Sequence, residues 1–168
     1  MNEQCKKMLI TIAITSFGIP TGVINGVIAW LMVKQPVSMS GMFAEMVIGC
    51  FFCGLIIPFF APLVLISHLK KHPDLTIGLR REKHIVSRFI PLNLFAGAVV
   101  IAMLVTILFA ILPFGAGLLL DTGLTVQPMT WILFKGFYNI LVAAAAGYFG
   151  TLNTLYAYAN KGRVSIGA

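Results

Sequence analysis

Long apolar runs separated by short polar stretches dominate the pattern of this 168-residue chain. Four runs exceed the ~18 residues that mark a membrane-crossing helix, because ~20 residues at 1.5 Å each cross a ~30 Å hydrocarbon core. The pattern predicts helices over residues 8–33, 46–67, 89–112 and 131–159. Pro113 lacks an amide donor and clashes with the preceding turn, so we expect the third helix to end or bend there. Residues 113–120 then form either a bent extension or a short re-entrant piece.

The composition places these helices in a membrane rather than in a soluble core. Hydrophobic residues make up 59% of the chain and charged residues 10%, with a mean hydropathy of +0.96. Soluble domains carry about 25% charged residues, so polar side chains cannot cover a soluble surface here. We therefore expect one all-α domain over residues 1–168, a polytopic membrane protein that forms a bundle of four transmembrane helices.

Basic residues gather at one set of helix ends. All but two of the 12 lysines and arginines lie at residues 6–7, 70–88 or 161–163. Lys34 and Lys135 lie at the opposite ends. The positive-inside rule then predicts that both termini and the loop 68–88 are cytoplasmic, in a bacterial cytoplasmic membrane. The same orientation puts Trp30 and Trp131 at the outer interface.

The formal net charge of +7 follows from this topology and does not indicate nucleic-acid binding. The loop 68–88 contains no aromatic residue on which a base could stack. Its mixture of apolar and cationic residues suits the surface of an anionic membrane. We expect the lipid bilayer as partner, with anionic headgroups at this loop, and no nucleic acid.

Glycines spaced four apart mark one face of the first predicted helix. Gly18, Gly22 and Gly26 form this face, which lets the backbone of another helix come close. The fourth helix offers small residues at the same spacing, including Ala143 and Gly147. The pattern favours packing within the chain, and the alternative is that this face meets a second copy or another membrane protein.

Polar residues within the spans are few, and a group of them falls in the predicted outer half. They form one candidate cavity, lined by Thr21, Asn25, Cys50, Cys53 and Asn139. Lys135 is the charged residue nearest to this depth. We expect its long side chain to reach the outer interface, towards Asp121.

Prolines interrupt the first two predicted helices at Pro20, Pro58 and Pro62. Broken helices expose backbone carbonyls that transporters use to bind ions and solutes, although prolines also simply shape membrane helices. Together with the polar cavity they favour a small permease or a transport-associated component, with no enzyme activity, cofactor or metal site assigned. A non-catalytic accessory protein of a membrane complex is an alternative.

Cys50 and Cys53 form a C-x-x-C pair near the outer end of the second predicted helix. Such a pair in a four-helix protein with both ends inside resembles the quinone-linked disulfide-forming proteins of bacterial membranes. Those proteins need a second cysteine pair in their second outer loop, and Cys5 is the sole other cysteine here. The resemblance implies a membrane thiol oxidoreductase as a further alternative.

The first part of the chain carries a second likeness. Residues 8–71 contain TGVINGVIAW, AEMVIGCFFCG and IIPFFAPLVLISHLKK in succession. This order resembles the two-helix unit of small, uncharacterised bacterial inner-membrane proteins, with a polar residue late in helix one and a proline-containing, basic-ended helix two. The resemblance implies a membrane location and no activity.

Overall fold

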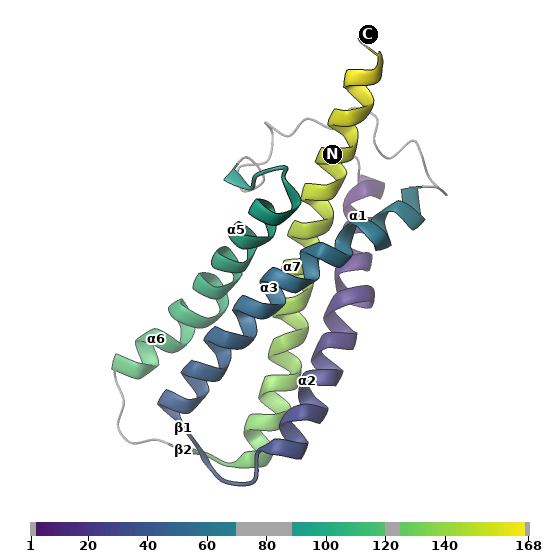
Figure 1. The fold of residues 1–168 in the computed structure, drawn as a ribbon. Helices are drawn as coiled ribbons and strands as arrows, with labels where there is room; N and C mark the ends of the chain where they lie inside the picture. Colours follow the sequence, from purple (N-terminus) through teal and green to yellow (C-terminus); the bar gives the residue numbers. More distant parts are fainter. Residues whose placement is uncertain (1–2, 70–88, 120–124, 167–168) are drawn as a thin grey trace.

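The computed structural model describes residues 3–69, 89–119 and 125–166, and most of them are helical (Figure 1). In chain order the elements are α1 (Glu3–Ile12), η1 (Ala13–Gly18), α2 (Ile19–Met32), β1 (Val37–Ser38), α3 (Met39–Leu69), α5 (Leu94–Thr106), η4 (Ile107–Ile111), α6 (Leu112–Leu119), β2 (Thr125–Val126) and α7 (Pro128–Ile166). Four helical stretches within these residues are long and apolar enough to cross a membrane: Glu3–Met32, Met39–Leu69, Leu94–Gly115 and Pro128–Ala159. The expected all-α class is confirmed.

Helix α7 is the centre of the arrangement. It contacts α1, η1, α2, α3 and α5, while α3 also packs against α5, η4 and α6. The beginning of α1 and the end of α7 lie at one end of the molecule (Figure 1). At the opposite end β1 pairs with β2 in antiparallel register, Val37 with Val126 and Ser38 with Thr125. This pairing holds the segment just before α3 against the segment just before α7.

Local capping starts α3 and α7 earlier than the apolar pattern predicts. The Ser38 hydroxyl accepts a hydrogen bond from the Gly41 amide at 3.2 Å, so α3 begins at Met39 and not near residue 46. Pro128 opens α7, where its missing amide would have no partner in any case. As a result, polar residues expected in the connections lie inside helices.

The third helix starts later than predicted. Asn93 caps α5, and its side-chain oxygen accepts hydrogen bonds from the amides of Phe95 and Ala96 at 3.0 and 3.1 Å. Helix α5 therefore begins at Leu94 and not near residue 89.

Two short π-helical segments precede prolines. The amide of Ile19, just before Pro20, donates to the Ile14 carbonyl, and the amide of Leu112, just before Pro113, donates to the Ile107 carbonyl. Both bonds reach five residues back instead of four. The wider turn relieves the clash of each proline ring with the preceding turn, so the helix continues.

Pro113 does not end the third helix. Helix α6 continues from Leu112 to Leu119, past the predicted helix end at residue 112. Of the two forms expected for this segment, the described residues 113–119 show the helical extension. The carbonyl four residues before Pro113 belongs to Phe109 and has lost its usual donor. The Tyr138 hydroxyl of α7 donates to that carbonyl at 2.7 Å. A side chain of the neighbouring helix thus replaces the missing backbone bond.

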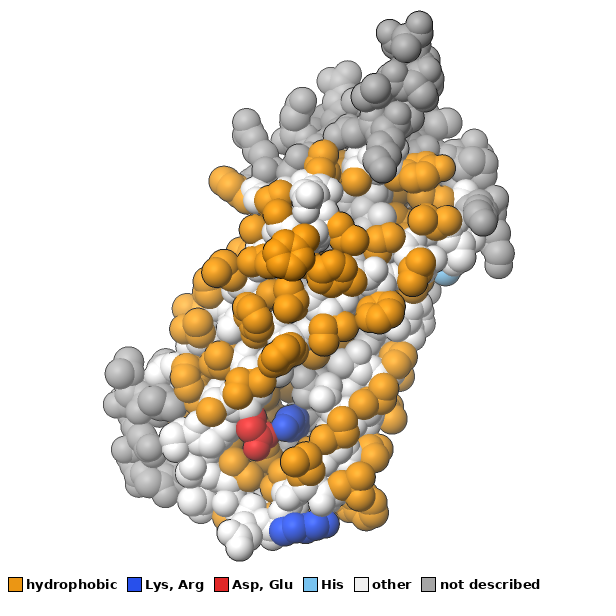
Figure 2. Space-filling model, viewed as in Figure 1, with side chains coloured by type: hydrophobic (Ala, Val, Ile, Leu, Met, Phe, Trp, Pro, Cys, Tyr) orange, Lys and Arg blue, Asp and Glu red, His pale blue; other side chains and the backbone are white. Residues whose placement is uncertain are grey.

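The surface is apolar along most of its length (Figure 2). Large hydrophobic side chains are exposed on α2, α3, α5 and α7. The interior holds a main cluster of buried side chains and a smaller one that includes Cys5, Leu65 and Tyr156. Helices that are apolar both inside and outside suit a lipid environment.

Candidate functional site

Residues of α2, α3 and α7 together line a cleft with polar side chains. Its volume is about 220 Å³, and it is lined by Asn25, Glu45, Met46, Ile48, Gly49, Lys135 and Asn139. Figure 2 shows an acidic and a basic side chain next to each other, with hydrophobic side chains and backbone atoms around them. Two opposite charges and two amides therefore share one recess in the lateral face of the molecule.

Glu45 and Lys135 form the ion pair of this cleft. The Lys135 ammonium donates to the Glu45 carboxylate oxygen Oε2 at 2.5 Å, and the indole Nε1 of Trp131 donates to the same oxygen at 3.4 Å. The Lys135 side chain is 19% exposed and that of Glu45 is 38% exposed. Because both are partly desolvated, removing either one leaves a charge with little compensation. The pair therefore ties α3 and α7 together about two turns after each helix begins.

The position of Lys135 corrects the sequence prediction. Its ammonium was expected to reach towards Asp121, which lies outside the described residues, and it instead pairs with Glu45. The prediction missed Glu45 because the second helix was expected to begin one residue after it. A signal was present in the sequence, since Glu45 and Lys135 are opposite charges at the same predicted ends of two spans.

Asn25 of α2 and Asn139 of α7 both line the cleft. Each side-chain amide donates to a carbonyl one turn earlier in its own helix: Asn25 to Thr21 at 3.0 Å and Asn139 to Lys135 at 2.8 Å. These bonds hold the nitrogen of each amide towards the helix. Each side-chain oxygen can accept a hydrogen bond and belongs to a residue that lines the cleft.

The structure brings together part of the predicted cavity. Asn25 and Asn139 line the cleft, whereas Thr21 contributes only its carbonyl, as the acceptor for Asn25. Cys50 is 0% exposed and belongs to the main core, and Cys53 is half-buried against it. Both cysteines are free thiols. Neither lines the cleft, so the C-x-x-C pair is separate from the polar site.

The glycine face of α2 packs against α7. A Cβ atom at Gly18 would lie 3.0 Å from the Ile140 carbonyl oxygen, and one at Gly22 would lie 2.8 Å from the Gly136 carbonyl oxygen. Gly26 also faces Gly136, at a looser 3.7 Å. Direct contact of helix backbones through glycine is typical of membrane helices.

The other predicted packing residues have different neighbours. Ala143 is buried in the core. A Cβ atom at Gly147 would lie 2.6 Å from the ring of Phe17, so this glycine makes room for an aromatic side chain of η1.

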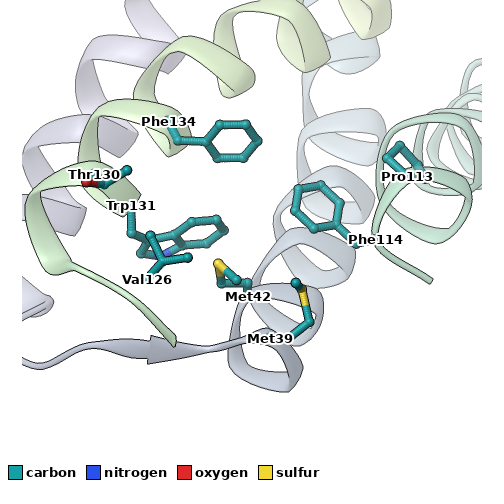
Figure 3. Close-up of a pocket in the computed structure, with 8 residues that line it drawn as sticks. All are labelled: Met39, Met42, Pro113, Phe114, Val126, Thr130, Trp131 and Phe134. Atoms are coloured by element: carbon teal, nitrogen blue, oxygen red, sulfur yellow. The ribbon is translucent and has the colours of Figure 1, made fainter. Parts of the chain in front are cut away.

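A second, apolar pocket is lined in part by the ring of Trp131, whose N–H donates to Glu45 (Figure 3). Its volume is about 360 Å³, and it is lined by Met39, Met42, Pro113, Phe114, Val126, Thr130, Trp131 and Phe134. Trp131 and Phe134 stack with ring centroids 5.7 Å apart, and Phe114 approaches Phe134 edge-on at 6.0 Å. The sequence predicted Trp131 at the outer interface, and in the structure its side chain packs against other protein groups. It is buried, with its ring on the apolar pocket and its N–H on the Glu45 carboxylate.

Comparison of the chain with known protein families, with curated proteins and with solved structures finds no match. Over the part of the chain that the structure describes, no group of three or more His, Cys, Asp or Glu residues is placed to hold a metal ion. Among the described residues, the polar cleft combines an ion pair with two side-chain amides, and it is therefore the candidate binding site. The expected headgroup contacts of the loop 68–88 fall almost wholly on residues 70–88, outside them.

Proposed function

We propose that the chain is a multi-pass protein of the bacterial cytoplasmic membrane and acts as a small permease or transport-associated component that binds its ligand in the polar cleft. The observation that carries the proposal is the Glu45–Lys135 pair in a recess open to the side of the helices. Ionisable groups within membrane spans are costly and usually mark a ligand or ion path. A purely structural ion pair would need no cleft and no additional amides.

Two further features support movement of a ligand. The π segments η1 and η4 interrupt regular bonding in the first and third spans, and such segments are frequent at functional sites. The Glu45–Lys135 pair links α3 to α7 near one end, so a ligand that replaces it loosens the contact between these helices. The proposed orientation has both termini in the cytoplasm, which puts the cleft in the outer half.

Reconstituted vesicles test the proposal with two probes that carry both charges. The probes are ¹⁴C-phosphoethanolamine, followed by uptake, and acyl-labelled fluorescent phosphatidylethanolamine, followed by dithionite quenching. We expect at least one to cross faster than in protein-free vesicles, and Glu45→Gln or Lys135→Gln to slow it by at least tenfold. The matched control is Glu3→Gln, which breaks the exposed Glu3–Lys7 pair at the other end. Failure of both probes to cross would refute the proposal.

A further inference from the structure

We infer that the polar cleft holds the headgroup of a zwitterionic phospholipid with a primary ammonium, of the phosphatidylethanolamine type. This rests on the proposed function, because it names the ligand class of the same site. In the bound state, the lipid phosphate accepts hydrogen bonds from the Lys135 ammonium and the lipid ammonium donates to the Glu45 carboxylate. The ligand thus exchanges with the existing pair, whose charged atoms already lie in contact.

Charge balance selects a zwitterion. Glu45 and Lys135 neutralise each other in a recess whose lining also includes the apolar residues Met46 and Ile48. An anion that takes Lys135 would leave the Glu45 carboxylate without its cation, and a cation that takes Glu45 would leave Lys135 without its anion. An unpaired charge in a partly desolvated recess is disfavoured. A ligand that carries both charges keeps each protein charge paired.

Hydrogen bonding selects a primary ammonium over a quaternary one. Among the residues that line the cleft, Glu45, Asn25 and Asn139 carry side-chain oxygens that can accept hydrogen bonds. A primary ammonium has three N–H donors to match these oxygens. A quaternary ammonium has none and prefers aromatic faces. The ring of Trp131, whose N–H donates to Glu45, lines the apolar pocket instead (Figure 3).

The depth of the pair matches that of a lipid headgroup. Glu45 lies six residues after Met39, where α3 begins, and Lys135 lies seven residues after Pro128, where α7 begins. At 1.5 Å per residue these offsets are about 9 and 10 Å. The 31 residues of α3 extend about 46 Å and exceed a ~30 Å hydrocarbon core by about 8 Å at each end. The pair therefore lies where hydrocarbon meets headgroups.

The shape of the cleft favours entry from the bilayer. It opens on the lateral face (Figure 2), and one wall includes Ile48, an exposed side chain on the apolar surface of α3. Its volume of about 220 Å³ is well above the roughly 10–15 Å³ that holds one water molecule in the same measure. This space accommodates a phosphoethanolamine group and leaves the acyl chains outside, along the apolar helices.

Native mass spectrometry of the protein in mixed micelles tests the inference. The micelles contain equal amounts of phosphatidylethanolamine, phosphatidylcholine and phosphatidylglycerol with identical acyl chains. We expect the wild-type protein to retain phosphatidylethanolamine at least tenfold over the other two. Glu45→Gln and Lys135→Gln should abolish the preference, while Glu3→Gln and Lys7→Gln should keep it because that pair is exposed. Equal retention of the three lipids by the wild-type protein would overturn the inference.

A second measurement applies even if the charge variants fail to fold. Asn25→Ala removes one acceptor at the edge of the cleft, and we expect it to reduce the preference at least threefold in a folded protein. Free phosphoethanolamine, added as a competitor at millimolar concentration, should leave the bound lipid in place. Displacement by the free headgroup would overturn the lipid assignment while leaving a permease for soluble zwitterions intact. Lipid binding without transport in vesicles would instead refute the proposed function alone.

Discussion

The contact between α2 and α7 allows a matched test at two neighbouring glycines. A Cβ atom at Gly22 would overlap the Ile140 side chain and lie 2.8 Å from the Gly136 carbonyl oxygen, whereas one at Gly26 would lie 3.7 Å from its nearest neighbour, the Gly136 Cα. The first distance is too short for a carbon and an oxygen, and the second is ordinary van der Waals contact. Alanine at Gly22 should therefore push α2 away from α7. Alanine at Gly26 should instead add a van der Waals contact between the same two helices.

The magnitude follows from two opposing terms. Glycine to alanine within a helix gains up to about 1 kcal/mol through helix propensity. Overfilling a packed contact costs about 1–3 kcal/mol. We therefore expect Gly26→Ala to stabilise the protein by 0 to about 1 kcal/mol, and Gly22→Ala to be less stable than Gly26→Ala by about 1–3 kcal/mol. Gly22→Leu should be less stable again, because its larger side chain has no space.

Equilibrium unfolding in dodecyl maltoside with added SDS, followed by far-UV circular dichroism, measures these differences. Gly49→Ala is the reference for helix propensity alone, because a Cβ atom there has no neighbour within 4 Å. The expected order of stability is Gly49→Ala and Gly26→Ala above Gly22→Ala. Equal stability of all three variants would mean that Gly22 faces detergent and that the α2–α7 contact is wrong.

Three further predictions concern other parts of the molecule. Tyr138→Phe removes the donor to the Phe109 carbonyl and should lower the free energy of unfolding by about 1 kcal/mol, with a smaller loss in a Pro113→Ala background, where a backbone amide returns. Replacing Cys50 and Cys53 with alanine should leave transport unchanged, and its loss would bring back the redox alternative. An impermeant thiol reagent added to intact cells should label a cysteine at Ser38 and spare one at Gly162, and the reverse pattern would overturn the orientation.

The sequence was sufficient for the fold class and insufficient for the exact helix ends. Apolar runs identify four spans because hydrocarbon requires about 20 apolar residues. The ends depend on local bonds that hydrophobicity does not report, such as the Ser38 cap of α3 and the Asn93 cap of α5. An error of seven residues at the start of α3 was enough to leave Glu45 outside the predicted site.

The sequence predicted which helix packs on the glycine face of α2, but not which residues of that helix make the contact. Small residues on the fourth helix predicted that it could approach α2, and α7 is the helix that does so. The contact uses Gly136 and Ile140, while the predicted Gly147 lies against Phe17. Which face of α7 meets α2 depends on the crossing of the two helices, and a single sequence contains no measure of that geometry.

The glycine contact and the polar cleft have a common origin. Gly22 and Gly26 hold α2 close to α7, and this fixes the rotation of α2 about its axis. Asn25 precedes Gly26 by one residue, which is about 100° around the helix, so close packing of the glycines turns Asn25 to the side where α3 lies. Substitutions that separate α2 from α7 should therefore weaken ligand binding as well as stability. A Gly22→Leu protein that remains folded yet retains phosphatidylethanolamine as strongly as the wild type would show that the cleft does not depend on this contact.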